Sequence, residues 1–273
     1  MARQYEYGFI GAGNMAEGII AAAVRDQLFK GSEILVSDPV GERRELMAQR
    51  FGVAIATDNA EIAARSRRIV LAFKPQNFAE AFSPVAGLIT GEHLLVSILA
   101  GMSTVRIEAA VPRICVRVVR VMPNLPIQVG AGTSGVCPGR YATGQDLADV
   151  QRLFEAGGGA VVLKDESLID AVTAVSGSGP AYFYYFVEAM VDGGAACGLS
   201  QEQALKLAAY TCLGAGKMML ESGEPPAELR RKVTSKGGTT QAALEHMASA
   251  GVDQAIRNAV QAAFDRAREL GRM

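Results

Sequence analysis

The segment from Val233 to Leu244 has the composition of a binding site for a small anion. It places two glycines, Gly237 and Gly238, among hydroxyl side chains and directly before an apolar pattern that predicts a helix. The first turn of a helix carries unpaired N–H groups and a partial positive charge, which suit a carboxylate or a phosphate. The same residues are compatible with a glycine turn followed by an ordinary threonine cap, so the segment by itself leaves both interpretations open.

A second chemical motif stands near the beginning of the chain, Gly8-Phe-Ile-Gly-Ala-Gly-Asn-Met-Ala-Glu-Gly18. Gly11 and Gly13 lie between a predicted strand and a predicted helix, where a missing Cβ lets the backbone approach a pyrophosphate. Ala16 occupies the third small position of this GxGxxA pattern and allows close contact between helix and strand. The motif predicts dinucleotide binding. Together with the first segment it indicates a dehydrogenase that binds its cofactor near one end of the chain and its substrate near the other.

Charged residues after the second predicted strand bear on the choice of cofactor. Asp38 is placed to meet the ribose hydroxyls of NAD(H), whereas Arg43 and Arg44 could attract the 2′-phosphate of NADP(H). The Asp38-Pro39 pair is equally compatible with a plain turn. The sequence therefore leaves the choice between NAD(H) and NADP(H) open.

Polar residues beside later strands could complete the same site. Lys74 follows the next strand on the edge where open α/β sheets bind ligands, although a solvated charge at a turn explains it equally well. Asn59 begins the helical stretch before that strand, and Asn124 follows a later strand. Both amides could reach the same cleft.

These motifs require an α/β fold to position them. Short apolar strands alternate with amphipathic stretches over the first 160 or so residues, which predicts a mostly parallel sheet with helices on both faces. Pro123, Pro126, Gly130 and Gly132 interrupt the pattern. The predicted strands are 7–10, 33–37, 68–73, 94–99, 115–121 and 160–163, and the helices among them include 14–27, 40–50 and 145–155.

The remainder of the chain, from Glu166 to Arg272, reads as almost entirely helical. We place the domain boundary near residue 164, which gives a dinucleotide-binding domain over residues 1–164 and an all-α domain over residues 165–273. Small residues are dense in the helices between 180 and 220, as expected where backbones approach closely. The apolar stripe of the last helix needs a partner, so the composition favours a dimer formed through these helices.

Composition excludes several other classes of function. The net charge is −1 and the charged fraction is 20%, so no general attraction to nucleic acid or to a membrane is expected. Four scattered cysteines, distant in sequence from both histidines, are typical of free thiols rather than a metal site. A strand-like segment starts within a few residues of Met1, and no apolar run is long enough to span a bilayer. We therefore expect a cytoplasmic protein.

Three separated motifs, GFIGAGNM at 8–15, SGSGPAY at 176–182 and VTSKGGTT at 233–240, together resemble the pyrroline-5-carboxylate reductase family. Further similarity at Phe73-Lys-Pro75, Met122-Pro-Asn124 and 168–173 extends the resemblance over nearly the whole length. It implies a Rossmann-type N-terminal domain and a helical C-terminal domain that interlocks with a partner's, often within a decamer of five dimers. It also implies reduction of 1-pyrroline-5-carboxylate to L-proline by NADPH or NADH.

The resemblance implies site residues as well, to which the reasoning above adds Asp38 and Gly238. Thr240 is the expected catalytic residue, because its hydroxyl would hydrogen-bond the ring nitrogen as the imine becomes an amine. The expected substrate contacts are Ser235, Gly238, Thr239, Thr240 and Glu166. The expected cofactor contacts are Ile10, Gly11, Ala12, Gly13, Asn14, Met15, Ser37, Asp38, Asn59, Ala72, Phe73, Lys74, Pro75, Leu99 and Ala100.

The chain departs from the family pattern at two positions. Lys236 stands where the family usually has proline, beside the expected carboxylate site, and Asp38 stands where many members have a smaller polar residue. Two alternatives stay open: a reductase of another small cyclic imine or of a 3-hydroxy acid, and a non-catalytic NAD(P)-binding regulator. The absence of a lysine in 181–188 disfavours the hydroxy acid, and the hydroxyls at 235, 239 and 240 disfavour the regulator.

Overall fold

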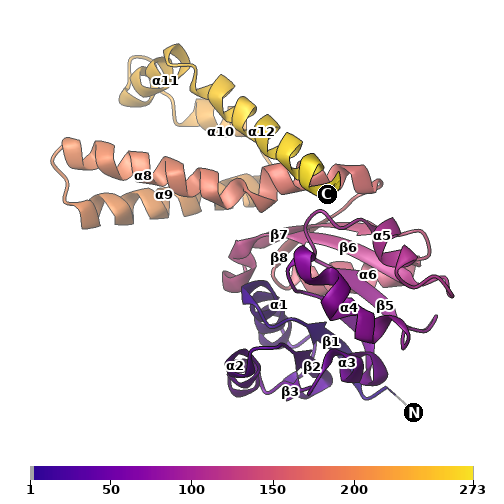
Figure 1. Cartoon of the computed structure of the whole chain (residues 1–273). Helices are drawn as coiled ribbons and strands as arrows, with labels where there is room; N and C mark the ends of the chain where they lie inside the picture. Colours follow the sequence, from indigo (N-terminus) through magenta and orange to yellow (C-terminus); the bar gives the residue numbers. More distant parts are fainter. Residues whose placement is uncertain (1–2, 273) are drawn as a thin grey trace. The chain divides into compact units, whose positions relative to one another are not determined.

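The computed structural model describes residues 3–272, and the chain divides into two compact units. The first contains the residues up to Ser178 together with those from Ala263 onward, and the second contains Gly179–Ala262. The first unit holds the sheet, and the second consists of helices and their connections (Figure 1).

Within the described residues, the first unit is built on an eight-stranded sheet of order β3-β2-β1-β4-β5-β6-β7-β8. Neighbouring strands are parallel except β6 and β7, which are antiparallel. The predicted mostly parallel sheet is therefore confirmed. The strands are β1 Tyr5–Ile10, β2 Ile34–Ser37, β3 Ala54–Ile55, β4 Ser66–Leu71, β5 Leu94–Ser97, β6 Arg117–Pro123, β7 Gly132–Pro138 and β8 Gly158–Val162.

Helices cover both faces of this sheet, as predicted. Alternate residues of β4 enter two separate cores: Val70 packs in one, and Ile69 and Leu71 pack in the other. Each fully buried aliphatic side chain contributes about 1.5–3 kcal/mol. The first core is closed by α1 Asn14–Arg25, α2 Gly41–Phe51 and α6 Gly144–Glu155, and the second by α3 Asn59–Arg65, α4 Phe78–Ala86 and α5 Thr104–Ala109.

Strand β7 was not predicted, because two of its residues are glycines that weaken the strand pattern. A Cβ on Gly132 would stand 2.6 Å from the backbone nitrogen of Ile127, and one on Gly135 would stand 2.8 Å from a methyl of Val172. The glycines are therefore required by close packing, which local strand propensity does not register.

The chain after β8 is helical, as predicted. Short turns and α7 Ile169–Val172 lead into a π-helical segment, Thr173–Gly177, which continues into α8 Gly179–Ala196. The later helices are α9 Gln201–Ser222, α10 Pro226–Lys232, α11 Thr239–Ser249 and α12 Val252–Arg272. Among residues 3–272, no helix combines the length and the apolar character that a membrane span needs.

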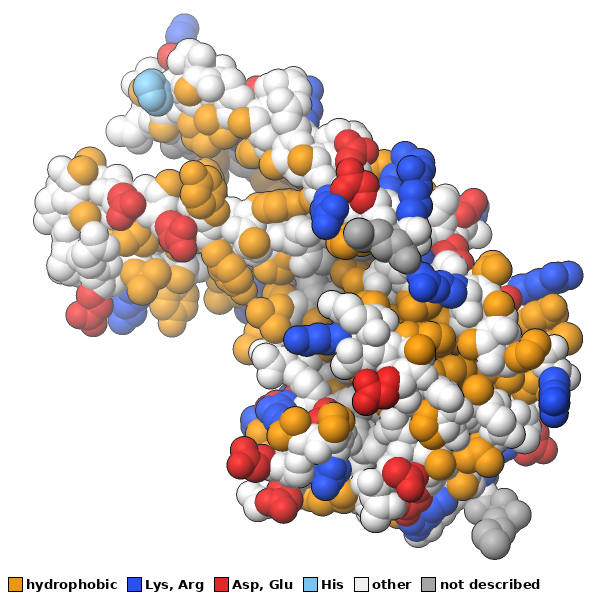
Figure 2. Space-filling view, in the orientation of Figure 1, with side chains coloured by type: hydrophobic (Ala, Val, Ile, Leu, Met, Phe, Trp, Pro, Cys, Tyr) orange, Lys and Arg blue, Asp and Glu red, His pale blue; other side chains and the backbone are white. Residues whose placement is uncertain are grey.

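Helices α8 and α9 form an antiparallel hairpin with a small core of its own (Figure 1). Only short or slender side chains are buried there, namely Val191, Ala204 and Ala208. Large apolar side chains along the same two helices are exposed, and Figure 2 shows hydrophobic residues gathered over this hairpin. Tyr185 is 76% exposed and Leu220 is 87% exposed. Apolar surface on this scale is typical of a protein–protein interface.

Candidate active site

A cavity of about 890 Å³ opens at the carboxyl edge of the sheet. We call it the carboxyl-edge cavity; its wall includes Ile10 at the end of β1, Ser37 at the end of β2, and Ala72 directly after β4. The chain passes from β1 to β2 on one side and later returns to β4 on the other side of β1. Such a reversal of strand order is the point at which open α/β sheets bind their ligands.

Most of the predicted cofactor contacts lie in this one wall. Ala12, Pro75, Leu99 and Ala100 do not line it, and the side chains of Ala12 and Leu99 are buried in the fold. Those that line the cavity are Ile10, Gly11, Gly13, Asn14, Met15, Ser37, Asp38, Asn59, Ala72, Phe73 and Lys74.

The other lining residues were not among the predicted cofactor contacts, although Arg44 was considered as a partner for a 2′-phosphate. They lie at or just after the carboxyl ends of strands, or on helices α2 and α4, so reading further past each strand would have found several of them. These residues are Pro39, Arg44, Thr57, Asp58, Asn77, Glu80, Ala81, Pro84, Ile98, Met122 and Pro123.

The turn between β1 and α1 needs its glycines for two different reasons. Gly11 has φ +104°, and a Cβ there would stand 2.5 Å from the carbonyl oxygen of Ala72. Gly13 is the N-cap of α1 and receives no side-chain cap, and no atom lies within 4 Å of the position of a Cβ on it. The start of α1 is thus open toward the cavity, as a pyrophosphate site requires.

Asp38 forms the turn considered for it from the sequence and also bonds the glycine turn after β1. Its Oδ1 accepts a hydrogen bond from the N–H of Val40 at 2.9 Å, which is the turn-forming role. Its Oδ2 accepts a hydrogen bond from the N–H of Ala12 at 2.7 Å, which fixes the carboxylate beside the glycine turn. Arg44 donates to the backbone carbonyl of Asp38.

Two amides that could have served the ligand are occupied in holding the fold. Asn59 accepts from the Ser37 hydroxyl at 2.7 Å and donates to the carbonyl of Ala81 at 2.9 Å, so it joins the end of β2 to α4 while lining the cavity. Asn124 donates to the carbonyl of Ser176 at 3.1 Å and accepts from the N–H of Thr133 at 2.8 Å. Asn124 is not part of the cavity wall, and both of these hydrogen bonds are made within the fold.

The predicted anion site lies in the second unit, at the start of α11. Gly237 has φ +73°, and Gly238 is the N-cap of the helix without any side-chain cap. The threonine cap considered from the sequence is therefore not formed. The N–H of Gly238 donates to the carbonyl of Ser235 at 3.1 Å, within the turn. The N–H groups of Thr239 and Thr240, in the first turn of the helix, are the remaining backbone donors for an anion.

Glu166 lies in the first unit and has a structural environment. Its Oε1 accepts from the N–H of Thr104 at 2.8 Å and from Arg120 at 2.9 Å, and its Oε2 accepts from the Thr104 hydroxyl at 2.6 Å. These contacts join the segment after β8 to the start of α5 and to β6. The other predicted substrate residues belong to the second unit.

Cys137 on β7 is a buried thiol beside this network. Burial, together with the nearby carboxylates of Glu166 and Asp165, raises the pKa of this thiol to about 11. The thiol is therefore protonated at neutral pH, which disfavours a nucleophilic role.

Comparisons with known proteins agree with this geometry. Residues 6–101 match the family "NADP oxidoreductase coenzyme F420-dependent", and residues 166–270 match "Pyrroline-5-carboxylate reductase dimerisation". The pyrroline-5-carboxylate reductase of Methanosarcina acetivorans is 41% identical over 97% of each chain, and that of Pseudomonas aeruginosa is 42% identical over 96% of this chain and 95% of its own. This chain belongs to the pyrroline-5-carboxylate reductase family.

Solved structures of family members superpose closely on it. The pyrroline-5-carboxylate reductase of Coxiella burnetii has a TM-score of 0.92 at 30% identity and covers 98% of both chains. The Plasmodium falciparum pyrroline carboxylate reductase, solved with NADP bound, has a TM-score of 0.86 at 27% identity over 99% of this chain and 100% of its own. The chain is thus an NAD(P)H-dependent oxidoreductase of this family, and its helical region is a dimerisation domain that forms homo-oligomers.

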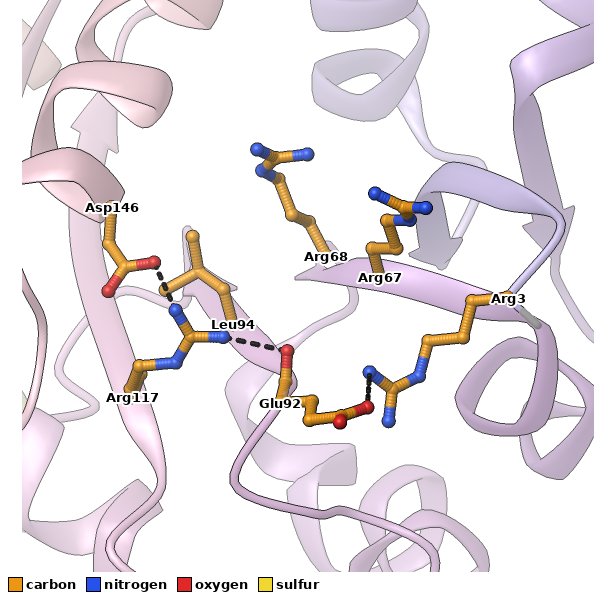
Figure 3. A pocket seen from close by; sticks show the side chains of 7 residues that line it. All are labelled: Arg3, Arg67, Arg68, Glu92, Leu94, Arg117 and Asp146. Atoms are coloured by element: carbon orange, nitrogen blue, oxygen red, sulfur yellow. Dashed lines mark hydrogen bonds and ion pairs between the residues drawn. The ribbon is translucent and has the colours of Figure 1, made fainter. Parts of the chain in front are cut away.

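The opposite edge of the same sheet carries a second concavity in this reductase, the amino-edge pocket, of about 420 Å³. Figure 3 shows its lining, which is dominated by arginines, and an anion site would be the first interpretation. Each guanidinium group is however paired with a carboxylate. Arg3 pairs with Glu92, Arg67 and Arg68 with Glu6, and Arg117 with Asp146. Because these ion pairs stabilise the fold, we do not interpret the pocket as a binding site for an anion.

Proposed function

We propose that this chain reduces 1-pyrroline-5-carboxylate to L-proline by hydride transfer from NAD(P)H, the last step of proline biosynthesis. Family membership over almost the full length supports this activity, because relatives from an archaeon and a bacterium carry the name of that reaction. The observation that carries the proposal is structural. Residues expected at the cofactor site, from four separate segments, line one cavity at the point where the strand order reverses.

We propose that the dinucleotide binds in the carboxyl-edge cavity. Its pyrophosphate would lie over the open start of α1, where Gly13, Asn14 and Met15 line the wall. Lys74 lines the same wall, is exposed, and would add a positive charge near the phosphates. When bound, the reduced nicotinamide supplies a hydride to the imine carbon.

We propose that the substrate carboxylate binds at the start of α11. The N–H groups of Thr239 and Thr240 would donate to it, with the Ser235 hydroxyl beside them. The Thr240 hydroxyl would hydrogen-bond the ring nitrogen and stabilise it as it becomes an amine. The protein then needs only to orient the imine and hold its carboxylate, because a protonated imine accepts a hydride readily.

The homo-oligomer would be a dimer through the C-terminal helices, and the family resemblance favours a decamer of five such dimers. We place the functional boundary between cofactor and substrate regions near residue 164, where β8 has ended and the dimerisation match is about to begin. A cytoplasmic location stays a prediction.

The test is the initial rate at which the purified protein oxidises NADH or NADPH in the presence of 1-pyrroline-5-carboxylate, followed by absorbance. We expect turnover with at least one cofactor. Thr240→Ala should lower kcat/KM about tenfold or more, the loss of one well-placed hydrogen bond. Thr234→Ala is the matched control, because the Thr234 hydroxyl already donates to the carbonyl of Arg230 at 2.7 Å. Folded protein that binds cofactor but shows no turnover would refute the assignment.

A further inference from the structure

The carboxylate of Asp38 is a fixed acceptor in the wall of the carboxyl-edge cavity. Its two oxygens accept from the N–H groups of Ala12 at 2.7 Å and Val40 at 2.9 Å. An ionised carboxylate has about four acceptor positions, so roughly two remain. Asp38 lines the cavity and is half-buried, so these positions can face a ligand.

The two cofactors present opposite chemistry to such an acceptor. The adenosine ribose of NADH has two hydroxyl groups that can donate hydrogen bonds to a carboxylate. A 2′-phosphate carries a charge of about −1.5 to −2 at neutral pH and has strong acceptor oxygens, so it would repel the same carboxylate. Asp38 also cannot turn away easily, because two backbone N–H groups hold it in place.

Arg43, one of the two arginines expected to attract a 2′-phosphate, is already occupied. It donates to the carbonyl of Ala12 at 2.8 Å and to Glu17 at 2.7 Å, and its side chain is only 28% exposed. Glu17 also forms an ion pair with Arg50, and the hydrogen bond from Arg43 to Ala12 links this group of charges to the glycine turn. The Nε and Nη2 donors of the Arg43 guanidinium are thus used by contacts within the protein.

Arg44 lines the cavity, but it donates to the backbone carbonyl of Asp38 and so lies next to that carboxylate. The rest of the wall does not supply a surplus of positive charge. Asp58 and Glu80 line the cavity as well, opposed by Lys74, so acidic side chains outnumber basic ones in the wall. A second phosphate on the ribose would meet a net negative surface.

We propose that Asp38 makes this chain selective for NADH over NADPH. Its carboxylate accepts hydrogen bonds from the 2′- and 3′-hydroxyls of the adenosine ribose and excludes the 2′-phosphate. The inference rests on the proposed function for the identity of the ligand as a nicotinamide dinucleotide. It does not depend on which imine is reduced.

The experiment measures the dissociation constants of NADH and NADPH by titration calorimetry, without an imine substrate. In the unmodified chain we expect NADH to bind about tenfold more tightly or better, the scale of one lost charge-assisted interaction. Asp38→Asn keeps the shape and removes the charge, and Asp38→Ser removes the long acceptor. Both should bring the two constants to within about threefold of each other, mainly by tighter binding of NADPH. Glu42→Gln removes the same charge from an exposed position that does not line the cavity, and it should leave the ratio unchanged.

Equal affinities in the unmodified chain, or an unchanged ratio in a folded Asp38→Asn variant, would overturn the proposal. The variant Arg44→Gln provides an independent test of the selectivity. It should weaken both cofactors to a similar extent, because Arg44 supports Asp38; a loss confined to NADPH would instead identify Arg44 as a phosphate ligand and overturn the selectivity. Preserved NADH binding without turnover of 1-pyrroline-5-carboxylate would reject the proposed function and leave the selectivity supported.

Discussion

The two edges of the sheet use polar groups in opposite ways. At the amino edge, Arg117 donates to Asp146 at 2.7 Å and to the carbonyl of Glu92 at 2.7 Å, and the other arginines of the amino-edge pocket are likewise paired with carboxylates. At the carboxyl edge, Gly13 leaves the start of α1 without a side-chain cap. The arginines of the first edge are paired with carboxylates, whereas the second edge offers backbone donors that a ligand can use.

This difference shows that the number of charged side chains in a pocket is a poor guide to whether the pocket binds a ligand. The amino-edge pocket gathers four arginines, yet ordinary ion pairs account for them. The carboxyl-edge cavity instead presents glycines, helix N–H groups and a few oriented side chains, which are individually inconspicuous. What distinguishes a site is donor and acceptor capacity that the fold has not used.

Gly11→Ala should have the largest effect on the carboxyl edge. The new Cβ would be forced into a positive-φ position and would stand 2.5 Å from the carbonyl of Ala72. We expect a loss of about 2 kcal/mol or more in the free energy of unfolding and cofactor binding weakened about 100-fold. Denaturant titration and calorimetry with NADH measure the two quantities. Unchanged cofactor affinity would show that the turn does not position the dinucleotide.

Gly13→Ala separates ligand binding from folding at the same turn. No atom lies within 4 Å of its Cβ position, and its φ of −70° suits alanine, so the free energy of unfolding should change by less than about 1 kcal/mol. The methyl group would project into the space that the pyrophosphate needs, so cofactor binding should weaken about tenfold. If both measurements stay at the level of the unmodified chain, the pyrophosphate does not lie over α1.

Asp146→Asn tests the other side of the comparison. Asp146 is 5% exposed, pairs with Arg117, and accepts from the Thr143 N–H and hydroxyl at 2.8 and 2.7 Å. Loss of its charge should lower the free energy of unfolding by about 2 kcal/mol, without changing kcat/KM or cofactor affinity. Arg67→Gln is the exposed control, since Arg67 is 59% exposed and 3.4 Å from Glu6, and it should cost less than about 0.5 kcal/mol. A fall in cofactor affinity with Asp146→Asn would contradict the division between the two edges.

The sequence predicted the architecture well where the periodicity was strong. Strands β1, β2, β4, β5 and β6 each contain consecutive buried apolar residues, as the central strands of a parallel sheet should. β3 is two residues long, and β7 contains glycines selected by packing against Ile127 and Val172. A strand of two residues has no periodic pattern, and the packing partners of the β7 glycines are known only once the tertiary structure is formed. Neither strand was therefore predicted.

Site residues could be predicted by position and less well by role. Motifs at strand ends placed Ser37, Asp38 and Asn59 in one cavity, because the carboxyl ends of parallel strands meet at one edge. The sequence could not show that the Asn59 amide donates a hydrogen bond to the carbonyl of Ala81, or that Arg43 donates to the carboxylate of Glu17. Such pairings join segments far apart in the chain, and no local pattern encodes them.

His93 offers the smallest test, a dependence of stability on pH at the amino edge. Its ring is 1% exposed, Nε2 lies 2.9 Å from the carbonyl of Ala63, and Nδ1 accepts the Thr90 N–H at 2.9 Å. Burial lowers the pKa of His93 below its usual 6.5, and the nearby Arg3 lowers it further. The unfolded chain therefore binds a proton that the folded chain does not, and the stability gained above pH 6.5 is lost as pH falls toward the depressed pKa.

His93→Gln should flatten this slope, measured as the free energy of unfolding at a series of pH values below 7. His246→Gln is the matched control, because His246 is exposed and should leave the slope unchanged. The ratio of cofactor affinities should not respond to His93→Gln at any pH, because the ring belongs to the edge whose polar groups serve the fold. A slope that survives the His93 substitution would assign the acid sensitivity to the paired carboxylates of the amino edge instead. The division between the two edges would then rest on the cofactor measurements alone.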